Sequence, residues 1–291
     1  MSRFILLISL ALSMLVSAGV AHAAAPTRFT VEVRGSTGPD VILIPGLASS
    51  RDVWDATAKA LEGSHRLHLV QVRGFGGLEA GPNAEGPVLD GLVSELAGYI
   101  RDNQLKAPAV IGHSMGGLTA LLLAERHPDL VGRVMIVDAL PFFGMLFGPS
   151  ATIDSVRPQA EQARGAYQTM PTEQLGQVQA ATMQRLAKDE AGRAKALAWS
   201  LASDRRVVGQ VTYEVMTTDV RPALPGVKVP VTVLFARDDA MGALAGYAEP
   251  LYQGAYAGLP DKRIIAVDGA FHFIMFDQPD AFARQVEAFL Q

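Results

Sequence analysis

Gly112-His113-Ser114-Met115-Gly116 directly follows the apolar run Ala107-Pro108-Ala109-Val110-Ile111, and this junction decides how the rest of the chain is interpreted. A serine between two glycines after a strand is typical of a sharp strand-to-helix turn that holds the hydroxyl above the edge of a sheet. Glycine is favoured on both sides because a Cβ there would collide with neighbouring backbone. The same pattern arises by chance in glycine-rich chains as an ordinary turn, so its surroundings decide its meaning.

The first 23 residues differ in composition from the rest of the chain. Arg3 is their only charged residue, residues 4–20 are almost wholly apolar, and Ala21-His22-Ala23 ends the segment with small side chains. This order is typical of a cleavable secretory signal peptide, and the apolar run is short for a membrane span. We therefore expect residues 1–23 to be removed, the mature protein to be periplasmic or secreted, and no membrane anchor to remain.

Charge and cysteine content exclude several classes of function. The chain has 25 basic and 29 acidic residues, a formal net charge of −4 and no basic block, so nucleic acid is not expected as a partner. The absence of cysteine excludes disulfides, a thiolate nucleophile and a cysteine-ligated metal. The sequence leaves the oligomeric state open.

Strand-like and helix-like segments alternate after the signal segment, which predicts an α/β fold with a mostly parallel central sheet flanked by helices. The expected strands are residues 29–34 at an edge, then 41–44, 67–72, 110–111, 134–137, 231–235 and 264–267. Helices are expected at about residues 53–61, 88–100 and 281–290, together with a small-residue helix after Ser114.

The alternation fails between residues 141 and 228, where the spacing of apolar residues becomes helical, as at Val208, Val211 and Val215. We interpret this segment as a helical cap inserted into a core made of residues 24–140 and 229–291. Its opening is rich in large apolar side chains, which pack the cap onto the core, line a substrate pocket, or do both. The candidate pocket residues are Phe142, Phe143 and Phe147, with Phe75 from the core.

A serine hydroxyl is a poor nucleophile at neutral pH unless a histidine accepts its proton and an acid orients that histidine. In the elbow architecture both partners follow the serine in the order acid, then histidine, each after a strand at the carboxyl edge of the sheet. Asp238-Asp239 follow the expected strand 231–235, and His272 follows the expected strand 264–267. The sequence therefore supplies both partners in the required order.

These residues make the chain resemble the α/β-hydrolase superfamily, in its branch with a helical cap after the sixth strand. The resemblance covers nearly the whole mature chain, and its matching motifs are Pro45-Gly46-Leu47, Arg73-Gly74-Phe75-Gly76, Gly112-His113-Ser114-Met115-Gly116-Gly117, Asp239, and His272 with Pro279 downstream. It implies that Ser114 is the nucleophile and His272 the general base. It further implies that the backbone N–H groups of Leu47 and Met115 form an oxyanion hole.

The identity of the triad acid rests on motif register. Family members often have a glycine three residues before the acid, and this spacing selects Asp239 over Asp238, although that position is Ala236 here. Asp138 is the main competitor, because some members take their acid from the end of the sixth strand. Otherwise Asp138 is a turn residue where the chain enters the cap. Two other departures are Ala243 in place of a proline and Pro45-Gly46 in place of His-Gly.

The resemblance predicts a serine hydrolase that cleaves a carboxylic ester through a Ser114-His272-Asp239 acyl-enzyme mechanism. The signal segment adds that the hydrolase is exported, and the apolar opening of the cap and the lack of a basic cluster indicate a small, largely apolar ester. A small-molecule ester is the expected partner, and neither a cofactor nor a metal is required. The same triad also serves lactonases, proline iminopeptidases, carbon–carbon bond hydrolases and perhydrolases. A non-enzymatic alternative is a protein that binds or senses a small ligand with a retained triad.

Overall fold

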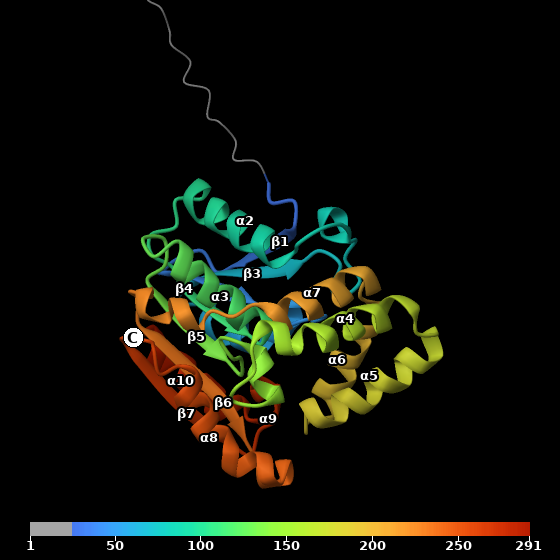
Figure 1. Ribbon diagram of the computed structural model, residues 1–291. Helices are drawn as coiled ribbons and strands as arrows, with labels where there is room; N and C mark the ends of the chain where they lie inside the picture. Colours follow the sequence, from blue (N-terminus) through green and yellow to red (C-terminus); the bar gives the residue numbers. More distant parts are fainter. Residues whose placement is uncertain (1–24) are drawn as a thin grey trace, which may run out of the picture.

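The computed structural model describes residues 25–291, so the expected signal peptide lies outside the described residues. The described chain forms a seven-stranded sheet in the order β1-β3-β2-β4-β5-β6-β7 (Figure 1). Strand β1 pairs antiparallel with β3, and the other strands are parallel. The strands are β1 (Phe29–Arg34), β2 (Asp40–Ile44), β3 (Arg66–Val72), β4 (Ala109–His113), β5 (Arg133–Val137), β6 (Val231–Arg237) and β7 (Lys262–Asp268). The predicted α/β fold is confirmed.

The central strands are continuously apolar because helices cover both faces of the sheet. Along β2, Ile42 and Ile44 face one core cluster, whereas Val41 and Leu43 face the other. The first face is covered by α2 (Leu89–Asp102), α3 (Met115–Arg126) and α8 (Ala243–Ala255), and the second by α1 (Asp55–Leu61) and α10 (Pro279–Leu290).

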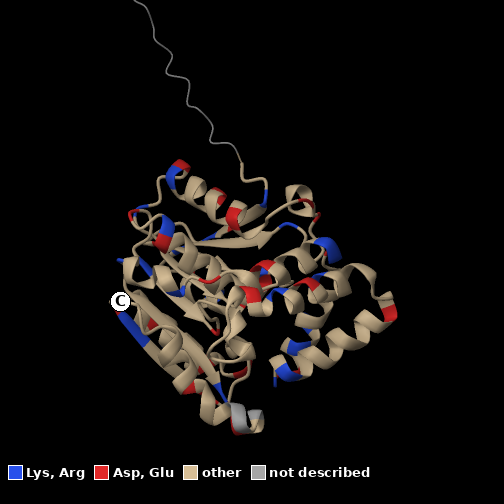
Figure 2. Cartoon of the chain, viewed as in Figure 1, with Lys and Arg blue, Asp and Glu red and all other residues tan. Residues whose placement is uncertain are grey.

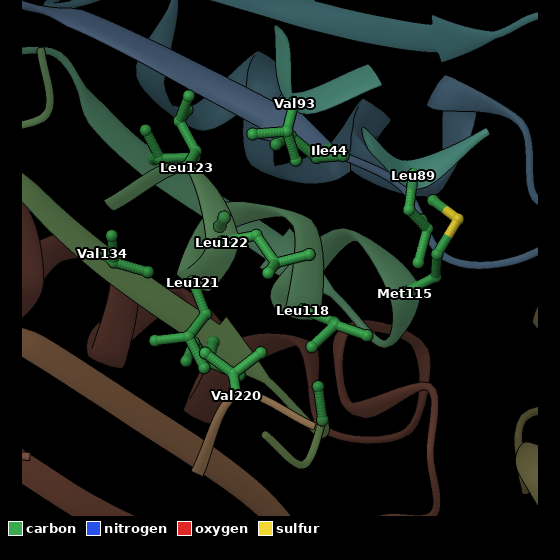
Figure 3. Close-up of a cluster of buried hydrophobic side chains, with 14 of the residues drawn as sticks. Ile44, Leu89, Val93, Met115, Leu118, Leu121, Leu122, Leu123, Val134 and Val220 are labelled. Carbon is green, nitrogen blue, oxygen red and sulfur yellow. The ribbon is translucent and has the colours of Figure 1, made fainter. Parts of the chain in front are cut away.

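Helix α3 is the best-buried helix of the core and directly follows the Ser114 turn. Its side chains Leu118, Leu121 and Leu122 lie among apolar residues of the sheet and of α2 (Figure 3). Each fully buried leucine contributes on the order of 2 kcal/mol through the hydrophobic effect. This packing fixes the amino-terminal end of α3, and with it the turn that carries Ser114.

The segment between β5 and β6 holds four α-helices: α4 (Ile153–Thr169), α5 (Thr172–Leu186), α6 (Glu190–Ala202) and α7 (Arg205–Thr217). They gather on one side of the sheet, with α4 packed on α7 and α5 packed on α6 (Figure 1). Side-chain caps start three of them: Thr152 for α4, Asp189 for α6 and Asp204 for α7. We call residues 141–228 the cap.

The short helices are η1 (Arg51–Trp54), η2 (Gly81–Ala84), η3 (Phe143–Phe147), η4 (Arg221–Gly226), η5 (Asp239–Met241) and α9 (Ile274–Asp277). Acidic and basic residues are interspersed over the molecule in the view of Figure 2. Within residues 25–291, no helix combines the length and apolarity needed to cross a membrane.

Candidate active site

Ser114 occupies the turn between β4 and α3 and has φ 53° and ψ −120°. This conformation lies in a region that non-glycine residues seldom adopt. The turn is held in place because the Ser114 N–H donates to the Val137 carbonyl at 2.8 Å, and the Ser114 carbonyl accepts from the N–H groups of Gly117 and Leu118. The serine is thus fixed at the carboxyl end of β4.

The two glycines that flank this turn are required by close backbone approach. A Cβ on Gly112 would lie 2.1 Å from the Gly116 carbonyl oxygen, and a Cβ on Gly116 would lie 2.3 Å from the carbonyl oxygen of Ile44. Both distances are far below van der Waals contact with rigid backbone. The steric reason expected from the sequence therefore operates at both positions.

His272 is held by a buried carboxylate. Its Nδ1 lies 2.6 Å from Oδ2 of Asp138, a residue that is 13% exposed and directly follows β5. The other carboxylate oxygen accepts from the Ala236 N–H at 2.9 Å and from the Tyr252 hydroxyl at 3.0 Å. With the Nδ1 proton directed at the carboxylate, Nε2 of His272 carries the lone pair needed to accept a proton.

These contacts keep Asp138 ionised. Burial alone would raise the pKa of its carboxyl group, but the hydrogen bond from His272, together with those from Ala236 and Tyr252, lowers the pKa below its usual value. Asp138 is therefore a carboxylate at neutral pH and can stabilise a positive charge on the His272 ring.

The sequence predicted that Asp239 would contact His272, and this prediction is corrected because Asp138 makes the contact. Asp239 is exposed and begins η5, whereas the partner of His272 is Asp138. The neighbouring Asp238 caps η5 through the Ala240 N–H and pairs with Lys188. Asp138 reaches the histidine because its φ of 48° redirects the chain after β5, while its N–H stays bound to the Leu234 carbonyl.

Sequence reasoning missed the support that α8 gives to Asp138. Tyr252 donates to the Asp138 carboxylate, and Tyr256, one turn later, donates to the Ala139 carbonyl at 2.8 Å. Burial raises the pKa of both tyrosines well above the usual value, so both hydroxyls remain protonated donors. The signal available in the sequence was the pair of tyrosines four residues apart, which share one helix face.

His113 directly precedes Ser114 and holds the backbone of His272. Its Nε2 lies 3.0 Å from the His272 carbonyl oxygen, and the two rings are 4.6 Å apart between centroids. Burial first, and the neighbouring His272 second, lower the pKa of His113 to about 3. His113 is therefore neutral at pH 7 and donates from Nε2, while its Nδ1 has no partner within the described residues.

The backbone on both sides of His272 is tied to the cap. The Phe273 N–H donates to the Leu186 carbonyl at the end of α5, and the Phe271 N–H donates to Asp277 at 2.8 Å. The other oxygen of Asp277 accepts from the N–H groups of Lys188 and Asp189 in the α5–α6 connection. The loop that carries His272 and the cap are thus joined through one carboxylate and one backbone bond.

The resemblance assigns the oxyanion hole to the backbone N–H groups of Leu47 and Met115. Leu47 is in the turn after β2 and lines the same cavity as Ser114, and Met115 is the first residue of α3. An N–H at the start of a helix has no carbonyl one turn earlier to accept it. No acceptor is found for the Leu47 N–H within the described part of the chain. Neither N–H group has a backbone acceptor among the described residues.

A cavity of about 140 Å³ lies between this cluster and the cap. It is smaller than the roughly 300–1,000 Å³ of sites for drug-sized ligands. The core and the cap both contribute lining residues, which are Gly46, Leu47, Ala48, Ser49, His113, Ser114, Tyr167, Gln179, Thr182, Met183, Leu186, Ser200, His272 and Phe273.

The four phenylalanines expected to line the pocket lie elsewhere. Phe75 and Phe142 are fully buried in the core, and Phe143 packs against the same core cluster. Phe147 is 58% exposed. None of the four lines the cavity beside Ser114, which corrects the expected pocket, and Phe142 and Phe143 pack the opening of the cap onto the core instead.

Comparison with known families agrees with this geometry. The model of the alpha/beta hydrolase family matches residues 41–285, which extend from the first central strand into the last helix. The chain belongs to the alpha/beta hydrolase family.

Two curated relatives of this α/β hydrolase cover most of its length. The pimeloyl-[acyl-carrier protein] methyl ester esterase of Aromatoleum aromaticum is 29% identical, over 86% of this chain and 97% of the relative. The sn-1-specific diacylglycerol lipase ABHD11 of Mus musculus is 26% identical, over 91% of this chain and 85% of the relative.

Two solved structures share the fold of this hydrolase. The enol-lactonase of Burkholderia xenovorans LB400 has a TM-score of 0.72 at 22% identity and covers 90% of this chain and 96% of its own. A thermophilic esterase of Thermogutta terrifontis has a TM-score of 0.74 at 19% identity and covers 90% of this chain and 92% of its own. The protein is thus an enzyme of the hydrolase class. Within residues 25–291, no group of three acidic, histidine or cysteine side chains is arranged to hold a metal ion.

Proposed function

We propose that this α/β hydrolase cleaves a small, uncharged carboxylic ester through a covalent acyl-enzyme on Ser114. In this proposal His272 is the general base, and Asp138, rather than Asp239, is the acid of the triad. The observation that carries the proposal is the 2.6 Å contact between Asp138 and His272 beside the cavity that contains Ser114.

The proposed reaction proceeds in two steps. The Ser114 hydroxyl attacks the ester carbonyl while Nε2 of His272 accepts its proton, and Asp138 stabilises the resulting imidazolium. The N–H groups of Leu47 and Met115 stabilise the oxyanion of the tetrahedral intermediate, an effect on the order of 3 kcal/mol for each donor. His272 then protonates the departing alcohol, and water releases the acid by the reverse sequence.

The names of the relatives support a carboxylic ester as the substrate, and the lining of the cavity favours an uncharged one. None of the described residues lining the cavity is lysine or arginine, so a phosphate or carboxylate on the substrate would lack a cationic partner. The curated relatives are named for cleavage of a methyl ester and of a diacylglycerol, both of which contain carboxylic esters.

Covalent labelling tests the nucleophile. A fluorescent fluorophosphonate should label the wild-type protein and leave Ser114→Ala unlabelled, and p-nitrophenyl butyrate should be hydrolysed only by the wild type. Circular dichroism checks that the variant is folded. Equal labelling of the two proteins would overturn the assignment of Ser114.

We also propose that the protein is exported, as the composition of residues 1–23 predicts. Expression of the full chain in a Gram-negative host should yield a periplasmic or extracellular protein shortened at its amino terminus, as read by intact mass. Leu12→Arg, which places a charge inside the apolar run, should leave the full-length protein in the cytoplasm. Recovery of an unprocessed wild-type chain from the cytoplasm would contradict export.

A further inference from the structure

The roof of the cavity contains a buried amide that belongs to the cap. Gln179, on α5, is 6% exposed and lines the cavity. Its side chain lies 2.9 Å from the hydroxyl of Tyr167 on α4 and 2.9 Å from the hydroxyl of Ser200 on α6. Three helices of the cap therefore meet at this one side chain.

The amide has unused hydrogen-bonding capacity. A glutamine side chain carries two N–H groups and two oxygen lone pairs. Gln179 donates one N–H to Tyr167 and accepts from Ser200 with one lone pair, and it has no further partner within the described residues. Because both partners are hydroxyls, which can donate or accept, reversing the amide would preserve both bonds. In either orientation one N–H and one lone pair remain for a ligand.

The surroundings hold Gln179 in place without adding charge to the cavity. Tyr167 is anchored because Arg205 donates from Nε to the Tyr167 carbonyl at 2.6 Å and from its guanidinium to the Met170 carbonyl. Burial raises the pKa of Tyr167, so its hydroxyl is neutral at pH 7. The Arg205 guanidinium is hydrogen-bonded to these two backbone carbonyls, and Arg205 does not line the cavity.

We propose that Gln179 determines specificity by hydrogen-bonding an uncharged polar substituent, such as a ketone or hydroxyl, on the acyl part of the ester. This inference rests on the proposed function of Ser114. It narrows the substrate class from small esters in general to oxo- or hydroxy-substituted ones. A wholly apolar acyl chain would displace water from the amide and leave its free N–H and oxygen unpaired, which is costly in a buried site.

An isosteric pair of substrates tests this inference. In p-nitrophenyl 4-oxopentanoate a ketone oxygen occupies the place of one methyl group of p-nitrophenyl 4-methylpentanoate. We expect the wild-type kcat/KM for the oxo ester to exceed that for the methyl ester by about tenfold, the ratio typical of one neutral hydrogen bond. Gln179→Met keeps a side chain of similar length without the amide, and its ratio should fall to about one.

Two further variants separate recognition from folding. Gln177→Met makes the same substitution at an exposed glutamine of α5 that does not line the cavity, so the ratio should stay as in the wild type. Gln179→Glu retains an acceptor for Tyr167 and Ser200 but loses the N–H, so the ratio should again fall. All variants should be labelled by the fluorophosphonate and hydrolyse p-nitrophenyl acetate.

The outcomes distinguish this inference from the proposed function. Loss of labelling and of all turnover in Ser114→Ala, together with an unchanged substrate ratio in Gln179→Met, would overturn only the role of Gln179. A wild-type preference for the methyl ester would overturn it as well. Labelling that survives in Ser114→Ala would overturn the proposed function itself.

Discussion

Asp138 and Asp239 both follow strands that end at the same edge of the sheet. Their side-chain contacts show which of the two is the partner of His272. Asp138 accepts three hydrogen bonds, including the one from His272, whereas Asp239 is exposed on η5. We predict that Asp138→Asn lowers kcat for p-nitrophenyl butyrate by about 10⁴-fold, because the amide disfavours the required His272 tautomer. Steady-state kinetics at pH 7.5 measure the loss.

Asp239→Asn is the matched control for that substitution. It should keep kcat within about threefold of the wild type, since it removes only an exposed charge. A larger loss of kcat in Asp239→Asn than in Asp138→Asn would show that Asp239 is the triad acid, as motif register predicts.

His113 makes stability depend on pH with a sign that follows from its burial. Its pKa is about 3 in the folded protein, against 6.5 for an exposed histidine. Between these pH values only the unfolded chain binds the proton, so lowering the pH destabilises the fold by about 1.4 kcal/mol per pH unit. We predict that the free energy of unfolding in urea falls by about 2 kcal/mol more between pH 7 and pH 5 in the wild type than in His113→Gln.

The comparison with His113→Gln isolates this residue because both proteins share every other titrating group. His113→Gln keeps a side chain that can donate toward the His272 carbonyl, and its lower absolute stability does not affect the difference between pH values. Parallel pH dependence in the two proteins would show that His113 does not remain neutral when folded.

At the scale of elements, the central strands were predictable because each is a short apolar run covered by helices on both faces, and β1 was predictable because its residues alternate as in an edge strand. The residues expected for β1 are those observed, and the other six strands differ only by a few residues at their ends. Helix α8 was not predicted: Gly246, Pro250 and Gly254 interrupt its helical pattern, and its stability comes from tertiary packing of Tyr252 and Tyr256. The carboxylate that contacts His272 was mispredicted for the same reason, because Tyr252, which donates to Asp138, lies on α8.

Asp277, on the short helix α9, joins the loop of His272 to the α5–α6 connection. We predict that Asp277→Ala lowers kcat about tenfold with less change in KM, because three backbone N–H groups lose their acceptor and the His272 loop gains freedom. The rate of fluorophosphonate labelling should fall in parallel with kcat.

Two variants test whether this effect comes from positioning. Asp277→Asn retains one carbonyl oxygen and should show an intermediate loss. Asp280→Ala removes a nearby exposed carboxylate at the start of α10 and should leave kcat unchanged. A tenfold loss in Asp280→Ala would point instead to a general effect of negative charge near the site.

At the scale of the whole molecule, the cavity exists only where the cap meets the sheet. The spacing of apolar residues predicted the helices of residues 141–228. It did not predict which residues line the cavity, because that depends on how α4, α5 and α6 converge over Ser114. Periodicity assigns residues to a buried face without saying whether a core or a ligand covers that face. Phe75 and Phe142 are core residues, Phe147 is exposed, and Gln179 was not predicted to line the cavity.

The small volume of the cavity sets a limit on acyl length. We predict that kcat/KM for p-nitrophenyl esters is highest between acetate and hexanoate and falls at least tenfold by decanoate, because about 140 Å³ cannot hold the longer chain. Met183, 7% exposed on α5, forms part of the wall, and Met183→Ala should move the optimum toward longer chains.

Val178→Ala is the control for that substitution, since Val178 is 43% exposed on the same helix and is not a lining residue. It should leave the dependence on acyl length unchanged. Equal rates for decanoate and butyrate in the wild type would show that the cap opens to admit long chains.

Ser114 and Asp138, with φ values of 53° and 48°, both have backbone conformations that glycine adopts more readily. Each conformation costs on the order of 1 kcal/mol of folding free energy. The three hydrogen bonds to Asp138 offset its cost, whereas the proposed nucleophile Ser114 opposes the stability of the protein that carries it. Laboratory evolution under heat selection alone would favour glycine at position 114, where no side-chain hydrogen bond is lost, and would yield a more stable but inactive protein. Selection for turnover must accompany any thermostabilisation of this hydrolase.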